Sequence, residues 1–333
     1  MMKKVLDAIR SRPKLILFIL LIFLIAIIIL LCSVYKIKSD YADLEKEFHA
    51  YENRFELLSP SIAWMNTEDF LAKQAKYNLN YGNLKMQIIN QLATAPHEKY
   101  GFYFEDLNTG SWIGVNEKEK FMPMSLFKIP VMMIILKKVQ EGDLSLDLKV
   151  MINPEDLDDR SGNLASKGAG YEITVRELIT IMIQESDNTA MKILVTRFIT
   201  EDDYIDLIGL VGIFQSSEEV NISPKEYANL FRSLYFSTYL RRTFSELALT
   251  ILLNTDFNSQ LPAGLPSDIQ ISHKVGMGIT KGYYHDCGIV YVPNDPYLIC
   301  VMGQNTTQEK ADLMISTLSR ITYNYVTKNF KEE

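Results

Sequence analysis

Cysteine and histidine are scarce in this sequence, and their scarcity limits the kinds of site the chain can build. Its 333 residues include three cysteines, Cys32, Cys287 and Cys300, and four histidines. No Cys-x-x-Cys pair occurs, and the histidines have no metal-ligand spacing. A structural zinc site needs such ligands at short spacings, so we expect neither a metal nor a cofactor. Whether Cys287 and Cys300 pair stays open, because the sequence does not give the register of their strands.

Positive charge is also in short supply. Lysine and arginine total 34 against 41 aspartate and glutamate residues, which leaves a net charge of −7. Nucleic-acid binding requires clustered positive charge, so nucleic acid is not an expected partner. The length is sufficient for one or two domains with a substantial core.

Charge is missing altogether from Leu15–Val34, a run of 20 residues. A helix of this length spans about 30 Å, the thickness of a bilayer core. Basic residues are frequent in residues 1–14, which the positive-inside rule places in the cytoplasm. We therefore expect a membrane anchor at 15–34 in contact with lipid and the rest of the chain outside. A cleaved signal peptide is the alternative, but the run is long and no Ala-x-Ala-like site follows.

Residues 35–82 are expected to form a helical stalk and connector. Apolar residues recur at steps of three and four from Val34 to Leu58, and the pattern stops at Ser59-Pro60. Such a heptad seam fits a homodimer through residues 34–58. It fits equally well an amphipathic helix packed on its own domain or on the membrane surface.

The remaining residues, 83–330, predict one domain of the α+β class. Strand-like runs occur at both ends, in 83–120 and 268–330, and each of these parts also contains a helix. We expect an antiparallel sheet packed with these N- and C-terminal helices. Residues 121–267 predict an inserted all-helical subdomain, and a ligand is expected where it meets the sheet.

A serine and a lysine stand three residues apart at the start of the apolar run Ile129–Leu136. Ser125 and Lys128 are separated by about one helical turn, so they share a face. A buried lysine is costly as a cation and readily becomes neutral, which suits it to act as a base toward a serine nucleophile. The pattern alone is weak, because Ser11 and Lys14 match it too.

Two further motifs follow in order. Ser186-Asp187-Asn188 lies between two helical patterns, and Lys274-Val275-Gly276 ends an alternating strand. With Ser125-x-x-Lys128, this ordered set resembles the penicillin-recognising serine hydrolases, nearest the class A β-lactamases, which carry Ser-x-x-Lys, Ser-Asp-Asn and Lys-Thr/Ser-Gly. The resemblance covers roughly Leu84 to Val326.

The resemblance implies a role for each catalytic residue. Ser125 attacks an amide carbonyl and forms an acyl-enzyme, and Lys128 takes the serine proton. Ser186 relays a proton to the leaving nitrogen. Lys274 supplies positive charge for an anionic substrate.

It also implies the substrate-binding residues. Asn188 bonds the substrate amide, and the backbone N–H groups of Ser125 and Met277 form an oxyanion hole. Gly276 allows the close backbone approach that this hole requires.

The sequence departs from the family pattern in two places. The interval between Asn188 and Ile222 is shorter than in class A enzymes, whose loop there carries a glutamate that activates the deacylating water. Glu218 and Glu219 are the candidates to replace that glutamate. Val275 replaces a hydroxyl residue. A chain that forms the acyl-enzyme on Ser125 but hydrolyses it slowly would fit both departures.

The expected function is therefore a serine hydrolase of the β-lactamase type, anchored in a bacterial cell membrane with its catalytic domain outside the cytoplasm. Its expected partner is a β-lactam or a peptidoglycan peptide. A DD-peptidase-like hydrolase is one alternative. A penicillin-binding sensor or structural protein that does not turn over is the other.

Overall fold

The computed structural model describes residues 26–27, 30–38, 55–59, 81–210 and 221–328. It divides into two compact units, Met1–Phe55 and Glu56–Glu333. Within the described part of the chain, no helix is both long and apolar enough to cross a membrane. Most of the anchor expected at 15–34 lies outside the described residues, as do 39–54 of the proposed dimer seam and most of the stalk.

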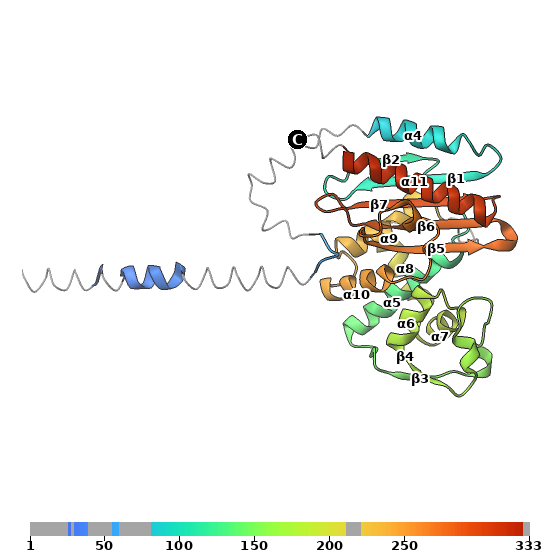
Figure 1. Cartoon of the computed structure of the whole chain (residues 1–333). Helices are drawn as coiled ribbons and strands as arrows, with labels where there is room; N and C mark the ends of the chain where they lie inside the picture. Colours follow the sequence, from blue (N-terminus) through green and yellow to red (C-terminus); the bar gives the residue numbers. More distant parts are fainter. Residues whose placement is uncertain (1–25, 28–29, 39–54, 60–80, 211–220, 329–333) are drawn as a thin grey trace, which may run out of the picture. The chain divides into compact units, whose positions relative to one another are not determined.

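The second unit is built on a five-stranded antiparallel sheet with the strand order β2-β1-β7-β6-β5. Its strands are β1 Lys99–Asp106, β2 Trp112–Val115, β5 Ile271–Gly278, β6 Tyr283–Val290 and β7 Tyr297–Gln304. Strands from the two ends of the domain pair directly, since β1 lies beside β7. The α+β class expected from the sequence is confirmed, and β5 forms one edge of the sheet (Figure 1).

One face of the sheet is covered by the first and last helices, α4 (Gly82–Leu92) and α11 (Gln308–Lys328). Alternate strand residues pack against them because side chains alternate between the two faces of a strand. The resulting core includes Phe102, Phe104, Ile299 and Val301 from the strands and Leu84, Ile88, Ile315 and Leu318 from the helices. Each such buried side chain contributes about 1.5–3 kcal/mol.

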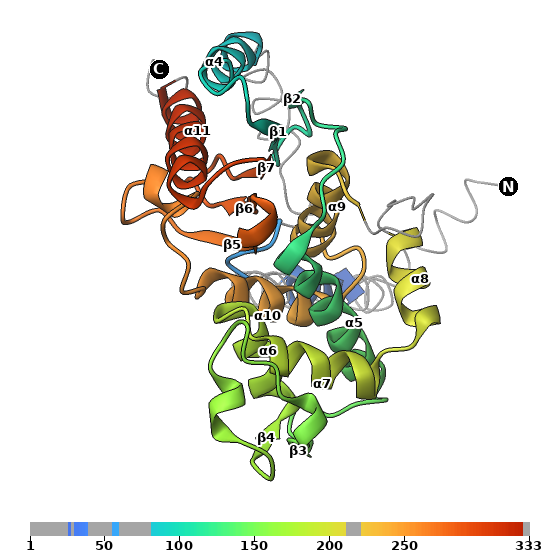
Figure 2. The same cartoon turned by 90° about the vertical axis from the view of Figure 1, so that its right-hand side faces the viewer.

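The opposite face is covered by α9 (Pro224–Tyr235) and α10 (Arg242–Leu253), as Figure 2 shows. The register places Tyr103, Cys300, Cys287 and Lys274 side by side across β1, β7, β6 and β5. Cys287 and Cys300 form a disulfide, which answers the question that the sequence left open. Lys274 therefore stands at the edge of the sheet, with the disulfide on the next two strands.

The inserted part contains α5 (Lys128–Glu141), α6 (Val175–Gln184), α7 (Asn188–Phe198) and α8 (Glu201–Leu210), besides α9 and α10. The prediction that it is all-helical is wrong, because β3 (Lys149–Met151) pairs with β4 (Glu172–Thr174). Each of these strands buries one residue, Val150 or Ile173. Three residues with one buried apolar side chain carry too little periodicity to be identified from sequence.

A short segment before the expected domain boundary also packs on this unit. Leu57 and Leu58 are buried, and the Ser59 N–H donates to the Tyr235 carbonyl over 3.0 Å. The Glu246 carboxylate on α10 accepts from the Leu57 N–H over 3.3 Å. The compact unit therefore begins at Glu56, ahead of residue 83.

Candidate active site

The serine of the first motif lies in a 3₁₀ turn, η2 (Met124–Phe127), and α5 begins only at Lys128. The sequence predicted that the α-helix would start at about Ser125. Pro130 fits the first turn of α5 because that turn does not use its missing N–H. The lysine Nζ lies 3.2 Å from Ser125 Oγ. The two side chains therefore meet although only one of them is on the α-helix.

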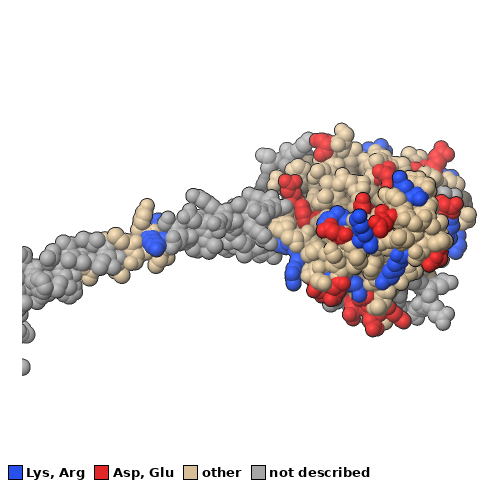
Figure 3. Space-filling view, turned by 90° about the horizontal axis from the view of Figure 1, so that it is seen from below, with Lys and Arg blue, Asp and Glu red and all other residues tan. Residues whose placement is uncertain are grey.

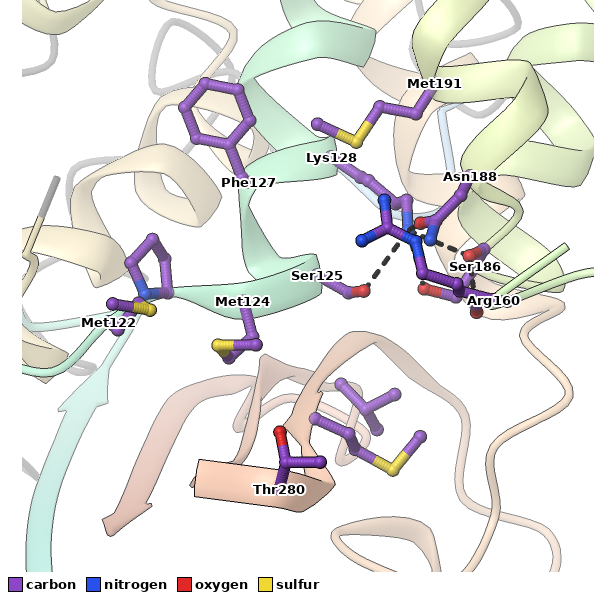
Figure 4. A pocket seen from close by; sticks show the side chains of 14 residues that line it. Met122, Met124, Ser125, Phe127, Lys128, Arg160, Ser186, Asn188, Met191 and Thr280 are labelled. Atoms are coloured by element: carbon purple, nitrogen blue, oxygen red, sulfur yellow. Dashed lines mark hydrogen bonds between the residues drawn. The ribbon is translucent and has the colours of Figure 1, made fainter. Parts of the chain in front are cut away.

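Lys128 is buried and fully engaged in hydrogen bonds (Figure 4). Besides Ser125, its Nζ donates to the Ser186 carbonyl over 2.8 Å, to Ser186 Oγ over 3.2 Å and to Asn188 Oδ1 over 2.9 Å. Burial lowers the pKa of the ammonium to about 8, while the carboxylates of Asp187 and Asp158 oppose the shift. A neutral amine is therefore accessible near neutral pH, as a proton acceptor requires.

Ser186 sits in the sharp connection between α6 and α7, where its φ is +57°. Left-handed backbone at a non-glycine residue costs on the order of 1–3 kcal/mol and persists where the surroundings hold it. Asp187 supplies that support as the N-cap of α7, accepting from the Ala190 N–H over 2.8 Å. Its other oxygen accepts from the Leu164 N–H over 2.8 Å.

A loop before α6 braces the same turn, and the sequence had given no role to it. The Ser161 hydroxyl donates to the Ser186 carbonyl over 2.9 Å, and the Asn188 N–H donates to the Ser161 carbonyl over 3.0 Å. Gly162 has φ +82° and lies against Asp187, where a Cβ would overlap the carboxylate. Gly162, directly after Ser161, is the feature of the sequence that could have indicated this loop.

Lys274 is completely buried on β5, and its Nζ has no hydrogen-bond partner among the residues that the structure describes. The Nζ lies 5.1 Å from the ring centroid of Phe257. Burial, and after it the charge of Lys128, lower the pKa of Lys274 to about 7, while Asp286 opposes both effects. A buried ammonium without hydrogen bonds favours an anion as its partner.

A cavity of about 760 Å³ opens between η2, the start of α7 and the end of β5. Lys274 is not among its lining residues, although its neighbour Val275 is. The polar lining of the cavity includes Ser125, Lys128, Ser186 and Asn188, whereas Val275 and Met277 line it from β5. Gly276 packs directly on the nucleophile turn, since a Cβ there would lie 2.7 Å from the Pro123 carbonyl oxygen. The structure thus brings the three motifs together at the junction where the sequence predicted a ligand.

The two candidate deacylation bases, Glu218 and Glu219, lie outside the described residues. The described residues that line the cavity include no aspartate or glutamate. No group of metal-ligating side chains occurs in the described ranges 81–210 and 221–328 either.

Arg160 lines the cavity and had no signal in the sequence beyond lying in a polar loop. Its guanidinium pairs with Asp158, with 2.9 Å between Nε and Oδ1, and this pairing holds the pKa of the Asp158 carboxyl far below its usual range. The Asn188 amide nitrogen lies 3.5 Å from the same Asp158 oxygen. Arg160 thus connects through Asp158 and Asn188 to Lys128.

The charge on the face shown in Figure 3 is mixed, with basic and acidic side chains interspersed. A nucleic-acid surface would gather charge of one sign. This view offers no such gathering.

Known proteins resemble the chain over the same region. The model of the beta-lactamase enzyme family matches residues 83–326. Beta-lactamase VEB-1 of Pseudomonas aeruginosa is 23% identical over 275 residues, covering 74% of this chain and 92% of the relative. A beta-lactamase of Streptomyces albus G is 24% identical, covering 69% of this chain and 81% of the relative.

Solved structures share the fold. A structure of PBP-A is 25% identical with a TM-score of 0.67, covering 74% of this chain and 96% of that one. A PBP-A mutant solved as an acyl-enzyme complex with penicillin G is also 25% identical, with a TM-score of 0.68 over 74% of this chain and 97% of that one. A beta-lactamase from Chitinophaga pinensis is 23% identical, with a TM-score of 0.67 over 74% of this chain and 99% of that one. The chain belongs to the beta-lactamase enzyme family, whose members are serine hydrolases of the class A β-lactamase type.

Proposed function

We propose that the chain is a membrane-anchored serine hydrolase that forms an acyl-enzyme on Ser125 with β-lactam amides. One observation carries this proposal. The Lys128 Nζ lies within hydrogen-bond distance of both Ser125 Oγ and Ser186 Oγ, inside a buried site. A base that touches both the nucleophile and a proton relay is the arrangement that amide acylation needs.

In the proposed reaction, Ser125 Oγ attacks the carbonyl carbon and its proton passes to the neutral amine of Lys128. The oxyanion is held by the backbone N–H groups of Ser125 and Met277, two residues that line the same cavity. The carbonyl carbon–nitrogen bond then breaks, and Ser186 passes the proton from Lys128 to the leaving nitrogen. Lys274 holds an anionic group of the substrate, and Asn188 bonds the substrate amide and orients Lys128.

A DD-peptidase-like hydrolase is the second candidate. The described lining residues supply no carboxylate to activate a deacylating water, which favours it over a β-lactamase. The likeness to PBP-A, at 25% identity, points in the same direction. The third candidate is a penicillin-binding sensor that remains acylated, and the acylation test described below would detect it.

We infer in addition that residues 15–34 anchor the chain in a bacterial membrane with its N-terminus in the cytoplasm. The disulfide Cys287–Cys300 supports an extracytoplasmic domain, because disulfides persist in oxidising compartments. Added protease should degrade the domain in spheroplasts with sealed membranes. Survival of the domain until the membrane is opened would contradict this orientation. Crosslinking of the full chain tests a homodimer through residues 34–58.

The acylation proposal is tested with the full-length chain in detergent, mixed with a chromogenic cephalosporin and separately with a fluorescent penicillin. Sustained colour that Ser125→Ala abolishes supports a β-lactamase. Stable labelling of Ser125 without turnover supports the other two functions, which a D-Ala-D-Ala peptide assay then separates. A folded chain that neither probe labels would exclude Ser125 as a nucleophile toward β-lactams.

A further inference from the structure

A buried histidine lies beside the nucleophile segment, outside the groups that the proposed reaction uses. His285 stands on β6 directly opposite Gly276 of β5 and is completely buried. It does not line the cavity. Burial lowers the pKa of its imidazole to about 4, so the ring is neutral at neutral pH.

Two backbone groups fix the proton on this ring. The Nε2 atom lies 2.9 Å from the Met122 carbonyl oxygen, which can only accept a hydrogen bond. The Gly303 N–H donates to Nδ1 over 3.2 Å, which requires Nδ1 to be unprotonated. Both bonds are satisfied by a single species, the neutral imidazole with its proton on Nε2.

The Met122 carbonyl belongs to a strained segment that leads into the nucleophile. Phe121 pairs with Ile222 through two backbone hydrogen bonds of 2.9 Å each. Met124, directly before Ser125, has φ +52°. A non-glycine residue in this region costs on the order of 1–3 kcal/mol, so the surrounding contacts must hold the turn in place.

The packing around His285 leaves little space for the segment to move. A Cβ on Gly276 would lie 2.7 Å from the Pro123 carbonyl oxygen and 3.1 Å from His285 Cδ2. The Phe121 ring meets the imidazole edge-on, with 5.9 Å between centroids. The segment 121–125 therefore packs against both His285 and the end of β5.

We propose that His285 is a positioning residue for Ser125. Its Nε2–H bond to the Met122 carbonyl holds the segment 121–125 against β5 and so sets Ser125 Oγ relative to the Met277 N–H. This inference rests on the proposed acylation of Ser125. Displacing a reacting group by about 1 Å can cost on the order of 10²-fold in rate, so the effect falls on the chemical step and leaves binding unchanged.

Two substitutions test the two hydrogen bonds of the imidazole one at a time. His285→Gln keeps an N–H donor near the position of Nε2, whereas His285→Asn keeps an acceptor near Nδ1 and loses the donor. We expect the acylation rate constant with fluorescent penicillin to fall about 30-fold in His285→Asn at unchanged penicillin affinity. His285→Gln should stay within about threefold of the natural chain. Equal rates in the two variants, or a slower Gln variant, would overturn the proposal.

A second measurement does not depend on acylation. In the natural chain, ¹⁵N spectra of the imidazole should show the neutral form protonated on Nε2 at neutral pH. The amide resonances of Met124 and Ser125 should shift in His285→Asn and remain in place in His285→Gln. The Nδ1–H form, or an imidazolium, would refute the positioning role even if the variants did not fold. Failure of every acylation probe on the natural chain, with these spectra as expected, would refute the proposed function and leave the His285 contact standing.

Discussion

The site holds two buried lysines in opposite ways, Lys128 in the helical wall of the cavity and Lys274 on β5 behind the sheet wall that Val275 and Met277 form. On the helical wall, Lys128 Nζ lies within hydrogen-bond distance of four acceptor atoms, one on Ser125, one on Asn188 and two on Ser186. Behind the sheet wall, Lys274 Nζ has no such acceptor among the described residues and faces the ring of Phe257. Both are almost completely buried, with exposed fractions of 1% for Lys128 and 0% for Lys274.

This difference suits the two lysines to different tasks. Hydrogen bonds hold the Lys128 amine in one place, where it can exchange a proton with Ser125 or Ser186. Lys274 Nζ has no hydrogen-bond partner among the described residues, and a buried ion in that state costs several kcal/mol until an anion neutralises it. This difference supports the proposal that Lys128 transfers protons and that Lys274 holds an anionic group of the substrate.

The largest effect is expected from removing the proton acceptor. Lys128→Met should lower the acylation rate of Ser125 about 10³-fold, because general base catalysis contributes roughly 10²–10⁴-fold. The measurement is the rate of labelling by fluorescent penicillin. Lys137→Met, on the same helix and paired with Glu141, is the matched control and should label normally. Labelling of Lys128→Met within tenfold of the natural rate would assign the base elsewhere.

Removing the unpartnered charge should weaken acylation less and should stabilise the fold. The pKa of Lys274 is about 7 in the folded chain against 10.5 ordinarily, so between these values the unfolded chain binds more protons. Stability therefore rises with pH across this range, and at pH 7 the charge costs about 4 kcal/mol. Lys274→Met should recover most of this free energy and flatten the pH dependence, as urea unfolding at about pH 7 and pH 10 would measure. A less stable variant at pH 7 would show that the charge has a partner.

The pH profile of acylation tests how the two lysines interact. The rate should rise about tenfold per pH unit below pH 8 and then level off, because Lys128, with a pKa of about 8, must be neutral to accept the proton. In Lys274→Met the midpoint of the profile should stay near pH 8, because Lys274, with a pKa of about 7, is already mostly neutral where Lys128 titrates. Labelling rates between about pH 6 and pH 9 decide this, and a flat profile would count against an amine base.

The smallest effect concerns the apolar surface of the sheet wall. Val275→Thr adds a hydroxyl at nearly constant volume, and a hydrogen bond to a charged group contributes about 1.5–3 kcal/mol. Acylation by β-lactams that carry a carboxylate should rise roughly tenfold, and acylation by the matching methyl ester should not change. Val275→Ala is the control for lost volume and should give no gain. An equal gain with the ester would mean that the hydroxyl does not contact the carboxylate.

Much of this molecule could be predicted from the sequence, because the relevant signals are local. Periodicity marked the helices, and Thr174 with Glu177, three residues apart, forms a capping box at the start of α6. The order of the three motifs and their local contexts were sufficient to bring Ser125, Ser186 and Lys274 into one site before their contacts were known.

The sequence by itself thus determined the α+β class, the family and the residue types of the site. Only the tertiary structure decided the Cys287–Cys300 pairing, the bracing by Ser161, the contact of His285 with Met122 and the difference between the two lysines. These features join residues that are distant in the chain or depend on strand register. Their energies come from long-range packing and burial, which no local pattern of residues encodes.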